Sequence, residues 1–173
     1  MSLLCTNCMR EVNKQSSLEK DESSPIAKIK VVEGGKAPWK ARESDSCWDL
    51  FVRDIESMGV LGVKVYLGVH IEPPKGYDVR LYVRSSFGES SWVLGNHVGI
   101  GDEEYRGEYI AIFNPIPIRT LNQEWIYTQF PYGIGDRCIQ MEIRKKDNVE
   151  LEIVEELSVT ERGSKGFGSS GNK

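Results

Sequence analysis

Long apolar runs, excess positive charge and amphipathic helical patterns are all scarce in this chain. No stretch approaches the ~20 apolar residues of a membrane-spanning helix, and residues 1–15 lack the basic start and apolar core of a secretory signal. The formal net charge is −4, which argues against nonspecific nucleic-acid binding because such binding rests on Lys and Arg neutralising phosphates. We therefore expect a cytoplasmic protein with no membrane or nucleic-acid partner, and a nuclear or host-cell location stays open.

Cysteine is also sparse, at four residues. Cys5 and Cys8 form a CxxC with no second pair and no nearby histidine. A structural zinc ion takes four ligands, so a zinc site at Cys5 and Cys8 would lack two of them. Cys47 and Cys138 are interpreted as small hydrophobic residues within strands.

The chain is long enough for one domain with a proper core and too short for two. Residues 1–25 are polar without a period of 2 or 3.6 and are expected to form a disordered extension. Residues 26–157 are expected to form the domain, and residues 158–173 a flexible Gly-rich C-terminal arm.

Short segments of alternating polarity predict an all-β sandwich or barrel. One face of residues 62–71 carries only apolar side chains, which predicts one long strand with a core face. Residues 108–115 are apolar on both faces and are expected to be buried, and residues 115–132 are expected to be a long excursion. Further strands are predicted at residues 27–33, 47–53, 77–84, 136–143 and 148–157.

Residues 92–107, WVLGNHVGIGDEEYRG, are the candidate centre of function. The stretch begins as a strand, turns through closely spaced glycines, presents the carboxylate of Asp102 and resumes at Tyr105. Glycines at that density let a backbone approach a ligand, because no Cβ stands in the way. A hairpin whose main chain reads a flat ring beside one acid suits a nucleotide; an ordinary Gly-rich turn with an acidic tip is the alternative.

The tail ERGSKGFGSSGNK cannot pack a core and has the composition of a frayed linker. Arg162 and Phe167 are nevertheless unusual in a linker. A guanidinium and glycine amides suit a phosphate chain, and a phenyl ring suits stacking on a base.

Five motifs in fixed order resemble those of the trimeric deoxyuridine triphosphatase (dUTPase) family. They are SCWDL (46–50), RSSFG (84–88), GNHVGIGDEEYRG (95–107), GDRCIQ (135–140) and RGSKGFGSSG (162–171). The resemblance implies a dUTPase-like β-barrel or jelly-roll sandwich and hydrolysis of dUTP to dUMP and pyrophosphate. It also implies Mg²⁺ as cofactor and a homotrimer with shared active sites.

The resemblance implies a role for each matching residue. Asp102 is the catalytic acid that holds and deprotonates the attacking water, and Asp49 positions magnesium through a water. Tyr105 lies under deoxyribose and leaves no room for a 2′-hydroxyl. The other substrate-binding residues implied are Asn96, Gly99, Ile100 and Ile110 at uracil, Arg84, Ser85, Ser86 and Gln140 at the phosphates, and Arg162, Phe167, Gly168, Ser169 and Ser170 in the arm.

Several positions depart from the family pattern. Cys47 stands where the first motif has glycine, and Gly101 replaces an apolar residue just before the acid. Trp48 replaces a smaller ring, Ile139 replaces a small residue, and Lys165 replaces a glycine of the arm. None of these changes removes a chemical group that the reaction needs.

Two alternatives stay open. A dCTP deaminase-type or bifunctional enzyme shares the fold and an RSS motif, but it would need a glutamate base and a cytosine-reading pocket. A non-catalytic relative would bind nucleotide, or a host protein, for regulation.

Overall fold

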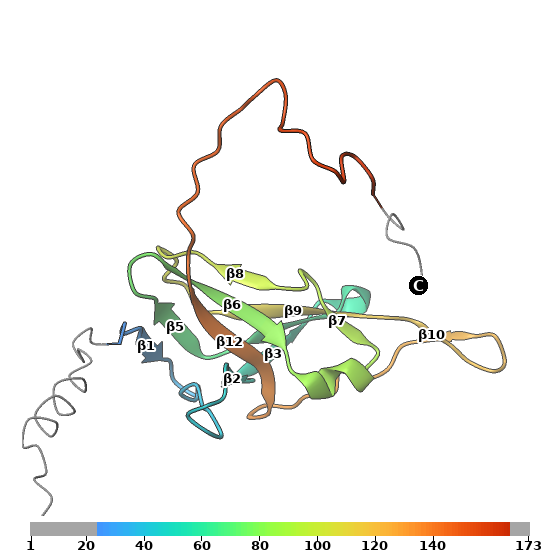
Figure 1. Ribbon diagram of the computed structural model, residues 1–173. Coiled ribbons are helices and arrows are strands. Elements are labelled where there is room, and N and C mark those ends of the chain that lie inside the picture. Colours follow the sequence, from blue (N-terminus) through green and yellow to red (C-terminus); the bar gives the residue numbers. More distant parts are fainter. Residues whose placement is uncertain (1–23, 167–173) are drawn as a thin grey trace, which may run out of the picture.

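The computed structural model describes residues 24–166 of the chain, which fold mainly into two antiparallel four-stranded sheets packed face to face (Figure 1). The expected N-terminal extension falls almost wholly outside the described residues, as do Cys5, Cys8 and the arm residues Phe167, Gly168, Ser169 and Ser170.

The regular structure of the described residues consists of twelve strands and two 3₁₀ turns. The strands are β1 (Lys28–Val31), β2 (Trp48–Phe51), β3 (Asp54–Ser57), β4 (Val63–Tyr66), β5 (Val69–Glu72), β6 (Tyr77–Val83), β7 (Trp92–Leu94), β8 (Gly99–Gly101), β9 (Ile110–Pro115), β10 (Ile118–Arg119), β11 (Trp125–Ile126) and β12 (Arg137–Lys145). The 3₁₀ turns are η1 (Gly59–Leu61) and η2 (Ser85–Glu89). The prediction of an all-β protein is therefore confirmed.

One sheet has the strand order β2-β12-β6-β8 and the other has the order β3-β4-β9-β7. Strand β1 pairs with β5, and β10 pairs with β11. The core lies between the two large sheets, where their inward side chains meet. It includes Leu50 from β2, Val79 from β6, Phe113 from β9 and Met141 from β12, all of them buried.

The alternating segment 62–71 is two strands rather than one. Its predicted core face is confirmed for Val65, Leu67, Val69 and Ile71, all of which are buried. The chain bends at Gly68, where φ is +69° and the backbone packs against that of Gly35. Only glycine adopts that conformation freely, so Gly68 allows the chain to bend here. As a result β4 joins the sheet β3-β4-β9-β7, whereas β5 pairs with β1.

The prediction that residues 108–115 are buried on both faces is wrong. In β9, Ala111 and Phe113 are buried, but Ile110 and Ile112 are exposed. Their face lies on the outer side of the sheet, so this strand leaves a row of branched apolar side chains uncovered in the single chain.

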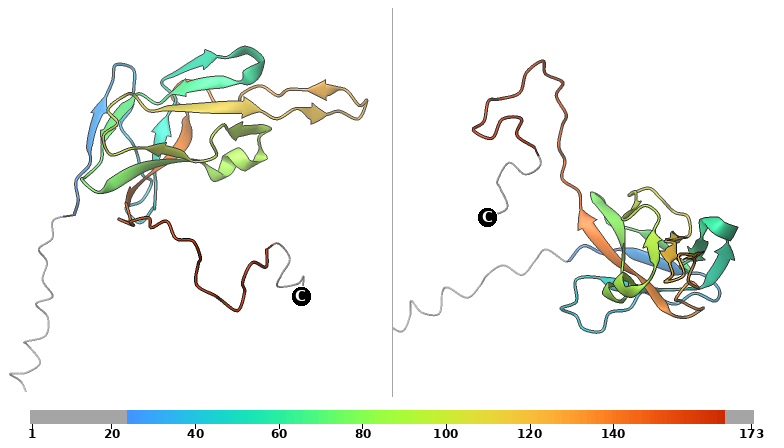
Figure 2. Two further views of the ribbon diagram at one scale, coloured as in Figure 1. Left: turned by 90° about the horizontal axis from the view of Figure 1, so that it is seen from above. Right: turned by 90° about the vertical axis from the view of Figure 1, so that its right-hand side faces the viewer.

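The excursion at 115–132 contains the hairpin formed by β10 and β11. Figures 1 and 2 show this hairpin projecting from the body of the molecule. Its turn includes Gln123 with φ of 66°, and Leu121 and Trp125 are exposed.

The prediction of a strand at 148–157 is also wrong. After β12 the chain leaves the body (Figure 1), and every residue from 147 to 166 is exposed. Val149, Leu151 and Ile153 alternate as strand residues do, but within the described chain no strand pairs with them. Alternation is a local pattern, whereas a strand also needs a partner for its backbone.

The two described cysteines occupy different settings. Cys138 is buried in β12, as predicted, but Cys47 is half-buried and lies just before β2 rather than within it. Within residues 24–166, no helix is long and apolar enough to span a membrane.

Candidate functional site

The Gly-rich stretch was predicted to form a hairpin, and this prediction is wrong. The stretch instead connects the two large sheets. Strand β7 pairs with β9 in one sheet, whereas β8 pairs with β6 in the other. The turn between them is held by the amide of His97, which donates to the carbonyl of Leu94 at 2.9 Å. The two sheets therefore part at this edge and leave room for a ligand.

A cavity of about 210 Å³ opens at this edge. Its lining residues are Leu81, Asn96, Gly99, Ile100, Gly101, Asp102, Tyr105, Tyr109 and Ile110. Strand β8 is an edge strand of its sheet, and edge strands present unpaired backbone donors and acceptors. The cavity thus combines free main-chain groups, a small carboxamide, one carboxylate and two tyrosine rings.

The loop that carries Asp102 is tied down by its own residues. The Asp102 carbonyl accepts a hydrogen bond from the Tyr105 amide at 3.0 Å. The Tyr105 hydroxyl donates to the Glu108 carbonyl at 2.9 Å. A Cβ on Gly107 would lie 2.6 Å from the Tyr105 ring, so the glycine lets that ring lie flat against the backbone.

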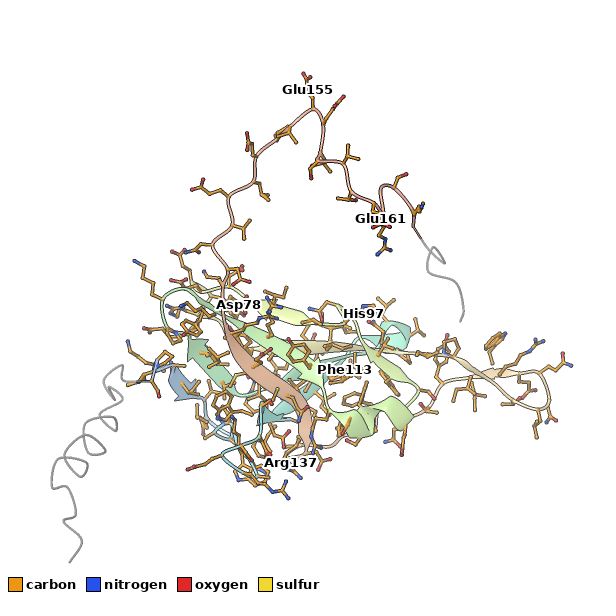
Figure 3. The ribbon with its side chains drawn as sticks, in the orientation of Figure 1. Asp78, His97, Phe113, Arg137, Glu155 and Glu161 are labelled. Carbon is orange, nitrogen blue, oxygen red and sulfur yellow. The ribbon has the colours of Figure 1, made fainter. Side chains whose placement is uncertain are left out.

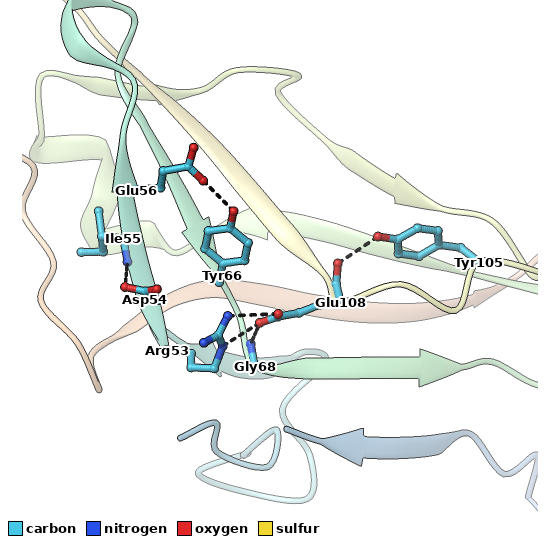
Figure 4. A network of polar contacts seen from close by, with 8 residues as sticks. All are labelled: Arg53, Asp54, Ile55, Glu56, Tyr66, Gly68, Tyr105 and Glu108. Carbon is cyan, nitrogen blue, oxygen red and sulfur yellow. Dashed lines mark hydrogen bonds and ion pairs between the residues drawn. The ribbon is translucent and has the colours of Figure 1, made fainter. Parts of the chain in front are cut away.

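Glu108 anchors this loop to the β2–β3 and β4–β5 connections, as Figure 4 shows. Its carboxylate accepts hydrogen bonds from Arg53 Nε at 2.8 Å and Nη2 at 3.1 Å, and from the Gly68 amide at 2.9 Å. Such a bidentate, partly buried pair fixes geometry well. Hydrogen bonding to the Glu108 carboxylate raises the pKa of Arg53.

Glu103, the residue after Asp102, makes a second anchor. Its carboxylate accepts hydrogen bonds from the Gly76 amide at 2.9 Å and from Lys146 Nζ at 2.6 Å. These contacts lower the pKa of Glu103, with the lysine hydrogen bond the main cause. Lys146 follows the last residue of β12, so this ion pair joins the Asp102 loop to the start of the C-terminal segment.

A second group of predicted residues lies around Asp49 on β2. Its Oδ1 accepts from Arg84 Nε at 3.1 Å, and its Oδ2 accepts from Arg137 Nη1 at 3.0 Å. Gln140 lies directly opposite Asp49 in the sheet register. The exposed residues Ser85 and Ser86 follow Arg84 in η2.

This second group carries net positive charge. One carboxylate against two guanidinium groups leaves a balance of +1, and the side chain of Arg137 is 39% exposed. A cavity of about 380 Å³ lies beside it, lined in part by Asp49, Gln140, Cys47 and Trp39. The two arginines are not among the lining residues of this cavity, but their guanidinium groups and the hydroxyls of Ser85 and Ser86 suit the oxygens of a phosphate chain.

The two groups lie at opposite ends of strand β6. Gly101, just before Asp102, pairs with Val79, whereas Arg84 follows the last residue of β6. Arg84 lies five positions after Val79, a span of about 16 Å at ~3.3 Å per residue. Figure 3 labels Asp78, near the start of β6, and Arg137, at the start of β12; because these strands are antiparallel, the two residues lie at opposite ends of the sheet. The described chain therefore holds two separate groups of candidate residues, the Asp102 group and the Asp49 group, here called half-sites.

The described part of the arm reaches neither half-site. Arg162 Nε donates to the carbonyl of Lys165 at 3.3 Å, and the Gly163 amide donates to the carbonyl of Thr160 at 3.1 Å. Figure 1 shows this segment standing away from the sheets.

Comparison with known proteins decides the family. The chain is 35% identical over 105 residues to the deoxyuridine 5′-triphosphate nucleotidohydrolase of Finegoldia magna, covering 60% of this chain and 67% of that protein. It is 36% identical over 110 residues to the enzyme of the same name from Gamma-proteobacterium EBAC31A08, covering 63% and 72%. The chain belongs to the dUTPase family.

Solved structures agree with this assignment. The dUTPase of Staphylococcus bacteriophage 80alpha, solved with dUpNHpp, superimposes with a TM-score of 0.66 at 25% identity, covering 84% of this chain and 98% of that chain. A tyrosine-to-phenylalanine mutant of the same phage dUTPase gives a TM-score of 0.66 at 26% identity, over the same shares. No protein-family model matches the chain.

The structure accommodates the departures from the dUTPase motifs. Cys47 is not among the described residues with positive φ, so a glycine is not needed there. Gly101 leaves space that the Tyr109 ring fills. Ile139 is buried in the core, and Trp48 receives Lys40 Nζ over its ring at 3.8 Å.

The structure adds three residues to the candidate site that the sequence analysis did not identify. Arg137 lies within the GDRCIQ motif and pairs with Asp49. Glu108 and Tyr109 follow the YRG of the third motif directly, and that adjacency was the only sequence signal available.

Proposed function

We propose that this protein hydrolyses dUTP to dUMP and pyrophosphate, with Asp102 as general base. One observation carries the proposal: Asp102 lies exposed at the mouth of a cavity built from the free edge of β8 and the Tyr105 ring. Backbone groups of β8, with Asn96 and Gly99, read the uracil ring, and Tyr105 lies against the sugar.

The reaction needs a water activated beside the α-phosphorus. Asp102 accepts a proton from that water as its oxygen bonds to phosphorus, and the bond from phosphorus to the bridging oxygen breaks to release pyrophosphate. A positioned general base contributes ~10²–10⁴-fold. The backbone ties of the Asp102 loop keep this carboxylate in place for the transfer.

The phosphates belong to the second half-site in this proposal. Arg84, Ser85, Ser86 and Gln140 bind phosphate oxygens, and the +1 balance around Asp49 offsets part of the substrate's negative charge. Preorganised charge of this kind acts most strongly where water is excluded.

Because a single chain separates the half-sites by about 16 Å, we propose that each active site forms between chains of a homotrimer. The half-site with Asp102 comes from one chain and that with Arg84 from a neighbour. The exposed apolar residues Val149, Leu151 and Ile153 support this assembly, since a second copy would cover them.

Magnesium fits this arrangement only as an ion held largely by the substrate. Within residues 24–166, no group of three or more His, Cys, Asp or Glu side chains could hold a metal, and both Asp49 oxygens are engaged by arginines. Mg²⁺ keeps several waters and often binds through phosphates plus one or two carboxylates. When bound it would neutralise phosphate charge, and Asp49 would contact it through a water.

The arm completes the site in this proposal. Phe167 stacks on uracil, while Arg162, Gly168, Ser169 and Ser170 bind near the γ-phosphate. Exclusion of water by this closure strengthens the electrostatic contacts inside.

Incubation of the purified protein with dUTP, dCTP or UTP, with and without EDTA, tests these assignments. We expect far more pyrophosphate from dUTP than from UTP or dCTP, loss of turnover with EDTA, and the mass of a trimer by light scattering. Ammonia released from dCTP would identify a deaminase instead, and nucleotide binding without turnover would identify a non-catalytic relative.

A further inference from the structure

Tyr109 is a buried residue of the nucleotide cavity for which the reaction proposed above gives no role. It follows Glu108 at the end of the Asp102 loop and is 3% exposed. Its hydroxyl has no hydrogen-bond partner among the described residues. A buried, unpaired hydroxyl ordinarily destabilises a fold. We therefore expect the packing contacts of the Tyr109 ring to offset this loss of stability.

The ring of Tyr109 is seated on Gly101, the residue just before Asp102. A Cβ added to Gly101 would lie 2.6 Å from Tyr109 Cε1 and would also collide with the hydroxyl. Any side chain at 101 would therefore compete with the ring for one volume. Gly101 and Tyr109 thus form a pair of complementary size directly beside the residue that carries the Asp102 carboxylate.

The same ring supports Tyr105. The two rings meet edge to face, with centroids 5.3 Å apart and an interplanar angle of 85°. The Tyr105 ring also packs against the backbone at Gly107, and its hydroxyl donates a hydrogen bond to the Glu108 carbonyl. Tyr105 as a residue is 43% exposed and lines the cavity, while Tyr109 limits how far its ring can retreat.

We propose that Tyr109 is a positioning residue for sugar selectivity: seated on Gly101, its ring holds Tyr105 where a ribose 2′-hydroxyl would collide. This inference rests on the proposed function, in which Tyr105 lies against the sugar. The ring acts through its volume and edge-to-face contact, and the hydroxyl plays no part in selection.

Four variants separate the ring from the hydroxyl and from stability. Tyr109→Phe removes only the hydroxyl, and Tyr109→Val removes the ring. Tyr105→Ala removes the ring that is proposed to exclude the 2′-hydroxyl, so it should cause the largest loss of preference for dUTP over UTP. Tyr132→Val is the matched control, because Tyr132 also packs an aromatic core ring, stacking on Phe87 at 5.8 Å, away from the cavity.

The measurement is kcat/KM for dUTP and for UTP, with melting temperatures for every variant. We expect Tyr109→Val to lower the dUTP preference by at least about tenfold, mainly by raising kcat/KM for UTP, since a steric exclusion is relaxed. Tyr109→Phe and Tyr132→Val should keep the preference within about twofold of the starting protein. Should Tyr109→Val prove unfolded, Tyr109→Leu keeps more apolar volume and serves in its place.

The outcomes separate this inference from the function on which it rests. An unaltered protein that fails to hydrolyse dUTP overturns both. An active protein whose folded Tyr109→Val variant keeps its preference overturns the role of Tyr109 alone. A Tyr109→Phe variant as unselective as Tyr109→Val also overturns it, because the hydroxyl would then be the acting group.

Discussion

Arg84 and Asp49 lie 35 positions apart in the chain, yet Arg84 Nε donates to Asp49 Oδ1 at 3.1 Å. This contact joins the first and second motifs. Arg137 from the fourth motif takes the other carboxylate oxygen at 3.0 Å. Three motifs that are far apart in sequence therefore meet at one carboxylate.

The first prediction concerns the stability of this cluster. Asp49→Asn should lower the free energy of unfolding by about 1–3 kcal/mol, because it removes the negative charge between two guanidinium groups at a mostly buried position. This loss of unfolding free energy is smaller than that expected on breaking a fully buried ion pair, because the side chain of Arg137 is partly exposed. Urea unfolding of this variant is compared with Asp147→Asn, which changes an exposed carboxylate. Equal stability of the two variants would show that the cluster contributes nothing.

The second prediction concerns catalysis. Asp102→Asn should lower kcat for dUTP by at least ~10²-fold while nucleotide binding persists, as expected for loss of a general base. Glu104→Gln is the matched control, because it neutralises an exposed carboxylate two residues away. Stopped assays for pyrophosphate give kcat, and calorimetry with dUMP gives affinity. Near-normal turnover by the Asn variant would remove Asp102 from the mechanism.

The third prediction concerns pH. Lys146 and the Gly76 amide lower the pKa of Glu103 in the folded protein below its ordinary value of 4.5. The ionised pair therefore stabilises the fold fully above the unfolded pKa, and this contribution is lost as pH falls through the lower folded value. Between pH 6 and pH 3 the melting temperature should fall more for the unaltered protein than for Glu103→Gln. Parallel pH curves for the two proteins would contradict the pairing.

The fourth prediction concerns the arm. Ending the chain after Thr160 should leave folding and assembly nearly intact, because the described contacts beyond this residue stay within the arm itself. Turnover of dUTP should fall at least about tenfold, since closure over the substrate is lost. Ordering such a segment costs ~1–2 kcal/mol per residue, which contacts to the triphosphate must offset.

Three measurements on the two chain lengths check this: turnover, thermal melting and oligomer mass. Binding of dUMP, which lacks the β- and γ-phosphates, should change little. Normal hydrolysis by the shortened chain would mean that the arm has no part in the reaction, and failure to fold would mean that it is structural.

Local pattern in the sequence was sufficient for much of the fold and for the identity of the family. Alternation at Val79 and Leu81 predicted the core face of β6, because side chains of any strand point to opposite faces in turn. The five motifs identified the dUTPase family and gathered the candidate residues.

Pairing between distant segments was decided only by the tertiary structure. Alternation at Val149, Leu151 and Ile153 predicted a strand that has no partner in the described chain. The opposite error occurred at Ile110, whose apolar character predicted burial although its face of β9 is exposed. Strand partners and covered faces are set by which elements pack together, and a local period does not encode that choice.

The candidate site shows the same division most clearly. The Gly-rich stretch pointed to Asp102, and the resemblance to the dUTPase family implied roles for Tyr105 and Asp49, since motifs record which side chains are present. The sequence could not indicate that Gly101 and Tyr109 share one volume, or that the two half-sites lie at opposite ends of β6. Those relations depend on strand register and on the space between side chains, which arise only when the sheets have formed.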